Sequence, residues 1–233
     1  MDASPLPSIR PLRALLLDVD NTLVDRAGAF PAYADRLLAA AGRAGDADLR
    51  LELIELDAGC YTARPLWARV TLAALPSLGW SYDQLRADFE EQILMLLQRP
   101  SPVLAELQAL RGRVRLVACT NGPSALQKAK ITGAGLVDLL DGAVISGELG
   151  GRKKPAPVMF ETALRAAGSI AAEAMMVGDN PEHDVLGAQA HGLRTAWIDG
   201  CWRRFELPVP LDLRADFTAP TPALMFAELS RLF

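Results

Sequence analysis

The stretch from Ala14 to Val24, ALLLDVDNTLV, constrains the fold more than any other part of the chain. A short apolar run is typical of a buried strand, so Asp18 should lie at the carboxyl end of that strand, with Asp20 two residues further on. In an open α/β sheet, ligands bind at this edge. Carboxylates there can act as nucleophiles, metal ligands or general acids, although two aspartates after an apolar run are also typical of a capped turn.

The overall composition predicts a soluble, globular protein. The chain has 233 residues, of which 51% are hydrophobic, so it can form one large domain or a core with a smaller second domain. Its net charge is only −4 and its basic residues are scattered, which indicates neither a nucleic-acid nor a membrane partner. No window approaches the roughly 18 to 20 apolar residues of a membrane span. The sequence does not define the oligomeric state.

The cysteines and histidines give little support to a thiolate metal site or to a nucleophile paired with histidine. Cys60, Cys119 and Cys201 are far apart and have no metal-binding spacing, which favours a reduced, cytoplasmic location. The short apolar run near the N-terminus is interrupted by aspartates and does not resemble a secretory signal. His183 and His191 are the only histidines, so a serine or cysteine nucleophile paired with histidine has little support, and we expect His183 to be a solvated helix residue.

The order of apolar patterns predicts two parts. Between about Phe30 and Arg99 the spacing is helical, with Gly and Pro between segments, which predicts an inserted helical unit. The rest alternates helices with strands, which are expected near 114–119, 143–146, 174–177, 195–198 and 215–218. Strands separated by helices form parallel sheets covered on both faces. We therefore expect an α/β fold: a Rossmann-like parallel-sheet core from residues 1–27 and 100–233, and an all-helical cap domain from 28–99.

Polar residues follow two further predicted strands at the points where they end. Thr120 and Asn121 follow the strand that ends at Cys119, and Asp179 and Asp184 follow the strand that ends near residue 177. The carboxyl ends of parallel strands share one edge, so these residues should meet Asp18 and Asp20. Crowded carboxylates repel one another unless a cation is present, and hard oxygen ligands suit Mg²⁺. For Asp179 and Asp184, capping of the following helix is the alternative.

Two other segments could bind an anion. Thr120 to Gly122 ends a strand and opens a helix, where backbone N–H groups can hold a phosphate, although TNG is also an ordinary turn. Lys154 stands before Pro155 in a glycine-rich segment, and proline biases the preceding residue toward an extended conformation. We therefore expect Lys154 on a loop, where its compact charge can pair with a carboxylate or a phosphate.

Taken in order, DVDNT at 18–22, Thr120 after a strand, Lys154 before proline and GDNPEHD at 178–184 resemble the four motifs of the haloacid dehalogenase (HAD) superfamily. The helical insertion after the first motif is similar to that superfamily's cap of the first type. The resemblance implies that Asp18 attacks phosphorus and forms an aspartyl-phosphate. It also implies that Asp20 protonates the leaving oxygen and later activates water.

The same resemblance implies how the cofactor and the phosphoryl group are held. Mg²⁺ would be bound by Asp18, the backbone carbonyl of Asp20 and Asp179, with Asp184 as a ligand or as support behind the ligands. Three groups would hold the phosphoryl oxygens, namely the Thr120 side chain, the Asn121 backbone and Lys154.

Within this superfamily the sequence favours one chemistry. Dehalogenating members lack the second aspartate of the first motif, so Asp20 favours phosphoryl transfer, and a predicted cap without lysine disfavours phosphonate cleavage through a Schiff base. We expect a Mg²⁺-dependent phosphatase acting on a small soluble phosphomonoester. A phosphomutase and a catalytically idle binding protein on the same fold are the alternatives. Arg64, Trp67 and Arg69 in the cap are candidates for contacting the rest of the substrate, although helix packing and exposure explain them equally well.

Overall fold

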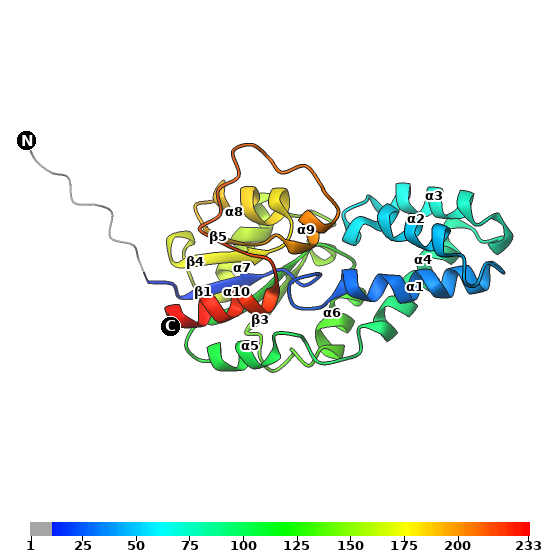
Figure 1. Ribbon diagram of the computed structural model, residues 1–233. Coiled ribbons are helices and arrows are strands. Elements are labelled where there is room, and N and C mark those ends of the chain that lie inside the picture. The colour runs from blue at the N-terminus through cyan, green and yellow to red at the C-terminus, as the bar shows by residue number, and fades with distance from the viewer. Residues whose placement is uncertain (1–10) are drawn as a thin grey trace, which may run out of the picture.

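The computed structural model describes residues 11–233 and is built on a six-stranded parallel sheet (Figure 1). The strands are β1 (Ala14–Leu17), β2 (Arg115–Thr120), β3 (Gly142–Ile145), β4 (Ala174–Gly178), β5 (Arg194–Ile198) and β6 (Phe217–Ala219). They lie in the order β3-β2-β1-β4-β5-β6, so the first strand occupies the middle of the sheet between β2 and β4. The predicted parallel α/β core is confirmed.

Helices cover both faces of this sheet, as the sequence predicted. Leu15 and Leu17 of β1 pack into the large apolar cluster that includes residues of α5 (Leu104–Leu110), α6 (Ser124–Gly133) and α10 (Pro222–Leu229). Leu16 points the other way, into a second cluster formed largely with α7 (Pro157–Ala167). A strand buried on both faces must be apolar at every position, which explains the uninterrupted run that ends at Asp18.

The insertion after β1 is an all-helical cap, which confirms that part of the predicted fold. Its helices are α1 (Arg26–Ala40), α2 (Ala47–Asp57), α3 (Arg64–Ala74) and α4 (Tyr82–Leu96). They lie together beyond one end of the core (Figure 1). Tyr33, Trp67 and Phe89 from three of them pack ring against ring, with centroids 5.2 to 6.4 Å apart. Packing of this kind, and not helix propensity alone, stabilises short helices.

The segment after the fourth motif differs from the single helix expected there. A π-helical turn at Pro181–Leu186 leads into a short α8 (Gly187–Gln189). The Asn180 side chain caps this turn, because it accepts hydrogen bonds from the backbone N–H groups of Glu182 and His183. The wider turn places the Asp184 carboxylate against the backbone N–H of Asn180. Such π turns often occur at functional sites.

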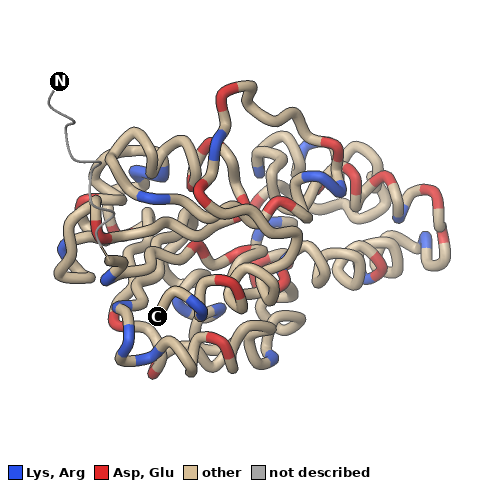
Figure 2. The backbone as a smooth tube through the Cα atoms, turned by 60° about the vertical axis from the view of Figure 1, so that its left-hand side comes forward, with Lys and Arg blue, Asp and Glu red and all other residues tan. Residues whose placement is uncertain are grey.

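Charged residues of both signs occur in both parts of the molecule. Figure 2 shows acidic and basic residues interspersed along both the core and the cap. Among residues 11–233, no helix combines the length and the apolar character that a membrane span requires.

Candidate active site

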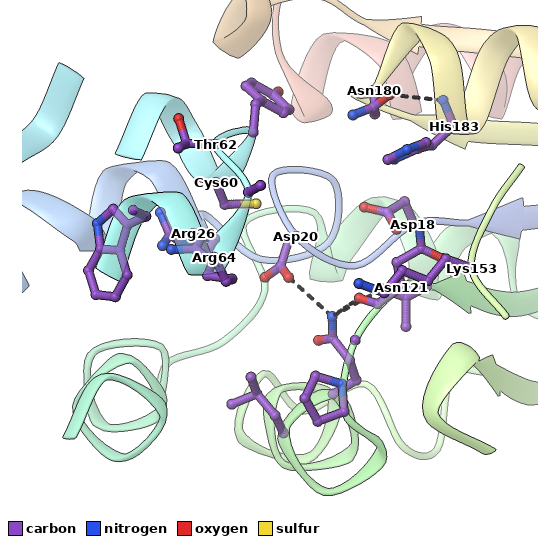
Figure 3. A pocket seen from close by; sticks show the side chains of 18 of the residues that line it. Asp18, Asp20, Arg26, Cys60, Thr62, Arg64, Asn121, Lys153, Asn180 and His183 are labelled. Carbon is purple, nitrogen blue, oxygen red and sulfur yellow. Dashed lines mark hydrogen bonds between the residues drawn. The ribbon is translucent and has the colours of Figure 1, made fainter. Parts of the chain in front are cut away.

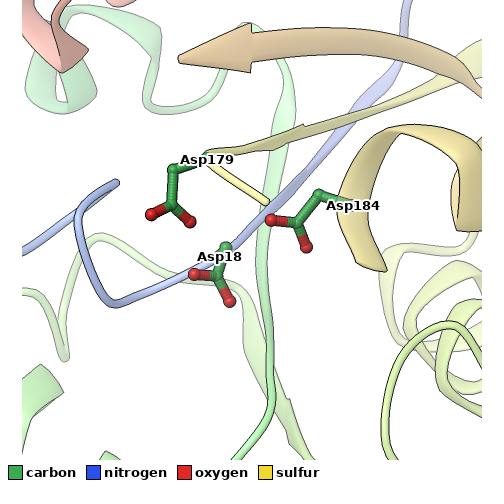
Figure 4. A group of neighbouring side chains, drawn as sticks. All are labelled: Asp18, Asp179 and Asp184. Carbon is green, nitrogen blue, oxygen red and sulfur yellow. The ribbon is translucent and has the colours of Figure 1, made fainter. Parts of the chain in front are cut away.

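Three carboxylates meet at the carboxyl edge of the sheet. Asp18 follows β1, and Asp179 and Asp184 follow β4; all three are buried, and one oxygen from each lies within 4.8 Å of the others (Figure 4). Gly178 makes this approach possible, because a Cβ atom at that position would lie 2.2 Å from Oδ2 of Asp184. The topology thus brings together carboxylates that are far apart in sequence.

Lys154 connects two of these carboxylates. Its Nζ donates to Oδ1 of Asp18 at 2.7 Å and to Oδ1 of Asp184 at 2.6 Å, and only 2% of its side chain is exposed. The side chain of Asn121 exchanges two hydrogen bonds with the Lys154 backbone, which fixes the lysine loop against the end of β2. Because its amide is engaged in this way, only the backbone of Asn121 is suited to the predicted contact with a phosphoryl group.

The electrostatics of this cluster favour a cation. Burial raises the pKa of Asp18 to about 6, with Lys154 lowering it and Asp184 raising it. Burial and the neighbouring Asp18 and Asp184 also raise the pKa of Asp179 well above its ordinary value. Three buried carboxylates face one lysine, and their hard oxygen atoms suit a divalent cation such as Mg²⁺. The donor set therefore fits the metal that the family motifs imply.

The three carboxylates are not equally available to that metal. Both oxygens of Asp184 already accept hydrogen bonds, one from Lys154 and one from the backbone N–H of Asn180. The hydrogen bonds to Asp179 from Asn21 and Tyr61 both reach Oδ2, so neither engages Oδ1. This arrangement favours Asp18 and Asp179 as ligands and Asp184 as the residue that holds Lys154.

Asp20 lies apart from this cluster and is held by α6. Lys130 Nζ lies 2.7 Å from both carboxylate oxygens, and Gln127 Nε2 donates to Oδ2 at 3.1 Å. Burial alone would raise the pKa of Asp20, but the charge and hydrogen bonds of Lys130 outweigh burial, and the pKa is lowered. Gln127 also donates to Thr120 Oγ1 at 3.2 Å, so one amide connects Asp20 with the end of β2.

Sequence reasoning missed Lys130 and Gln127. The available signal was that Lys130 is one of only four lysines in the chain and lies three residues after Gln127, on the face of α6 that also buries Ile131. A lysine on a buried helix face requires a partner, and here the partner is Asp20.

Capping does not account for Asp18 and Asp20, whereas Asp184 does accept a backbone hydrogen bond from Asn180 at the start of the turn after β4. Asn180 caps the turn after β4, and Asp25 caps α1 by accepting from the backbone N–H of Gly28. The Asp18 and Asp20 side chains instead accept hydrogen bonds from lysine and glutamine side chains.

The loop after β1 also connects the core with the cap. Asn21 adopts a left-handed backbone conformation with φ of 56°, which asparagine tolerates better than most residues. Its Nδ2 donates to the carbonyl of Gly59 at 2.8 Å and to Oδ2 of Asp179 at 2.9 Å. The Tyr61 hydroxyl, from the cap, donates to the same oxygen. The cap thus contacts a predicted metal ligand directly.

A cavity of about 550 Å³ lies between the core and the cap (Figure 3). Asp18, Asp20, Thr120, Lys154 and Asp179 line its core end. The cap end is lined by Arg26, Arg64, Trp67, Phe89 and neighbouring residues.

Two expectations about the surroundings of this cavity change. His183 lines it and is partly buried, so the expected fully solvated position is wrong. Arg69 is exposed and does not line the cavity, unlike Arg64 and Trp67. Burial lowers the pKa of His183, which keeps the imidazole largely neutral near neutral pH.

The sheet, its acidic edge and the inserted helices define a class of protein: a Rossmann-like enzyme with a helical cap over its site. Residues 12–192 match the haloacid dehalogenase-like hydrolase family, and the chain belongs to that family. The predicted superfamily membership is thereby confirmed.

Comparisons with individual proteins agree with this assignment. Phosphoserine phosphatase from Thermus thermophilus is 31% identical over 87% of this chain and 95% of its own length. Ribulose-1,5-bisphosphate 5-phosphatase from Halopiger xanaduensis is 40% identical, over 46% of this chain and 43% of its own. Among solved structures, the HAD-hydrolase YfnB from Bacillus subtilis, bound to magnesium, has a TM-score of 0.75 at 19% identity and covers 94% of this chain and 99% of its own. These phosphatase relatives confirm the expected enzyme class, a phosphoric monoester hydrolase.

Proposed function

We propose that the protein is a Mg²⁺-dependent phosphatase that hydrolyses a small phosphomonoester through an aspartyl-phosphate on Asp18. The observation that carries this proposal is the separation of two aspartates only two residues apart. Asp18 lies in the acidic cluster with Lys154, whereas Asp20 is held away from that cluster by Lys130 and Gln127. Two carboxylates in different environments suit two different roles.

In the first step, Asp18 attacks phosphorus and the bond from phosphorus to the leaving oxygen breaks. Asp20, which is ionised in the free protein, takes up the proton of the monoanionic phosphate group when the ester binds and gives it to the leaving oxygen. In the second step, the Asp20 carboxylate takes a proton from water as the water attacks the phosphorus of the aspartyl-phosphate. The bond from phosphorus to the Asp18 oxygen then breaks, and inorganic phosphate is released.

Other residues hold the phosphoryl group during both steps. Thr120 Oγ1, the backbone of Asn121 and Lys154 Nζ are proposed to donate hydrogen bonds to its oxygens, and Lys154 is positioned for this by Asp184. Mg²⁺, when held by Asp18, the backbone carbonyl of Asp20 and Asp179, supplies positive charge against the same oxygens.

The proposal also covers the roles of the two domains, the class of substrate and the cellular location. We assign the chemistry to the core of residues 1–27 and 100–233, and the choice of substrate to the cap of residues 28–99. The printed names of the relatives support a small-molecule phosphomonoester as the substrate. Cys60, Cys119 and Cys201 are all unpaired, which supports a reduced, cytoplasmic location.

A panel of phosphomonoesters assayed for inorganic phosphate with Mg²⁺ tests the proposal. We expect release of phosphate from at least one member, and loss of at least about 10⁴-fold in kcat for Asp18→Asn because the nucleophile is removed. The matched control is Asp138→Asn, at an exposed aspartate outside the cavity, which should keep its activity.

Three results would contradict the proposal. Conversion of a sugar phosphate to its isomer without release of phosphate would indicate a phosphomutase. Failure to hydrolyse any ester would indicate a binding protein. Unchanged hydrolysis by Asp18→Asn would exclude Asp18 as the nucleophile.

A further inference from the structure

The cap end of the cavity contains a charge cluster that is not balanced. Asp57, at the end of α2, is buried and accepts hydrogen bonds from both Nη atoms of Arg26, including Nη2 to Oδ1 at 2.7 Å. It also accepts from Arg64 Nη1 at 3.0 Å and from the backbone N–H of Cys60 at 3.0 Å. Two guanidinium groups thus share one carboxylate, which leaves one excess positive charge.

The two arginines differ in what they can still bind. Arg26 is buried, is engaged by Asp57 through both Nη atoms, and lies 5.0 and 5.2 Å from the ring centroids of Phe30 and Phe89. The Arg64 side chain is 34% exposed and reaches Asp57 through Nη1 alone. A guanidinium has five N–H donors, so Arg64 keeps several for a ligand.

The surroundings fix the Arg64 guanidinium in place. It lies over the rings of Trp67 and Phe89, with its Cζ 5.3 and 4.9 Å from their centroids. Arg64 is also the first residue of α3, and the preceding Ala63 offers no side-chain cap, so the positive end of the helix dipole adds to the charge there. A stacked, held guanidinium loses little freedom when it binds an anion.

The other charges along this part of the cavity are already balanced. Arg86 and Glu90 line the cavity and lie 3.9 Å apart. Lys130, which is paired with Asp20, and Lys153, which lies near Asn121, belong to the core end (Figure 3). The excess charge of the cap end therefore lies at Arg64. A single excess charge matches a monoanion, and a planar carboxylate matches the two parallel donors of a guanidinium.

We propose that the substrate carries a carboxylate at the end remote from its phosphate, and that Arg64 binds this carboxylate at the cap end of the cavity. This inference rests on the proposed phosphatase function and specifies its substrate class. Trp67 and Phe89 line the cavity beside Arg64, and the cavity of about 550 Å³ accommodates a small substrate of this kind.

The test compares esters that differ only in the carboxylate: phosphoserine with phosphoethanolamine, and 2-phosphoglycolate with ethyl phosphate. We expect kcat/KM to be higher by about 10-fold or more for the carboxylated member of each pair, as for one hydrogen-bonded charge pair. Arg64→Met should reduce this ratio by about the same factor, mainly through KM. Arg69→Met removes the same charge from the exposed side of the same helix and should leave the ratio unchanged.

The outcomes separate this inference from the proposed function. If the esters are hydrolysed but the wild-type ratio is near one, or Arg64→Met does not change it, the carboxylate site is wrong and the phosphatase function stands. A stronger preference for 1,3-propanediol bisphosphate would also overturn the assignment of a carboxylate. If no ester is hydrolysed, the phosphatase function is wrong. Calorimetric titration of Asp18→Asn with both members of each pair then decides whether the carboxylate site exists. The carboxylated ester must bind more tightly than its partner, and this difference in affinity must be lost when Arg64 is also replaced by Met.

Discussion

The two ends of the cavity are built in different ways. At the core end, Asp18 and Asp179 come directly after strands and Thr120 is the last residue of one, and the parallel sheet alone brings them to one edge. At the cap end, Arg26 and Arg64 come from different helices, and they are held together by the Asp57 carboxylate and by the Phe89 ring, over which both guanidinium groups lie. Topology places the reacting groups, whereas side-chain packing places the groups that we assign to specificity.

This comparison predicts that the stability of the cap end depends strongly on the buried carboxylate of Asp57. Asp57→Asn leaves two guanidinium groups without their counter-charge, and the loss of one partner from a buried ion pair costs about 3 to 5 kcal/mol. We expect a corresponding loss in the free energy of unfolding, measured by denaturant titration. Asp48→Asn, at an exposed position in the first turn of α2, should cost less than about 1 kcal/mol. Equal losses in the two variants would show that the Asp57 cluster does not hold the cap end together.

A smaller effect, on kcat, is expected from Lys130, which α6 contributes to the core end. Lys130→Met removes the cation that keeps Asp20 ionised and oriented, and we expect kcat to fall by about 10- to 100-fold with little change in KM. Lys130 lowers the pKa of Asp20, so its removal raises that pKa. Because Asp20 must be ionised to act as the base in the second step, the acid limb of the kcat profile should move to higher pH. Lys130→Arg should recover part of the activity.

The matched control for this experiment is Lys128→Met. Lys128 lies on the same helix but is exposed and pairs with Glu148 at the surface. If the two methionine variants have the same kcat and the same pH profile, Lys130 does not position Asp20, and the core end depends on strand ends alone.

The same contrast explains what could be predicted from the sequence. An apolar run followed by a carboxylate locates a strand end, so the parallel sheet, the helical cap and the convergence of Asp18, Thr120 and Asp179 followed from local patterns. Lys130 could not be placed, because the sequence does not define the rotation of α6 against the sheet. The pairing of Arg26 with Asp57 joins two helices across a loop, and neither residue has a local signal for it. Asp184 in the π turn is likewise held by Lys154, which is 30 residues away in sequence.

The most direct test of the account is to identify the residue that becomes phosphorylated. The wild-type protein would be mixed with a hydrolysed ester and Mg²⁺, quenched within one turnover and reduced with borohydride, which converts an aspartyl-phosphate to homoserine. Peptide mass spectrometry would then locate the modified position. We predict homoserine at position 18 and unmodified aspartate at position 20. Modification at another residue, or full turnover with no modification at position 18, would contradict the account.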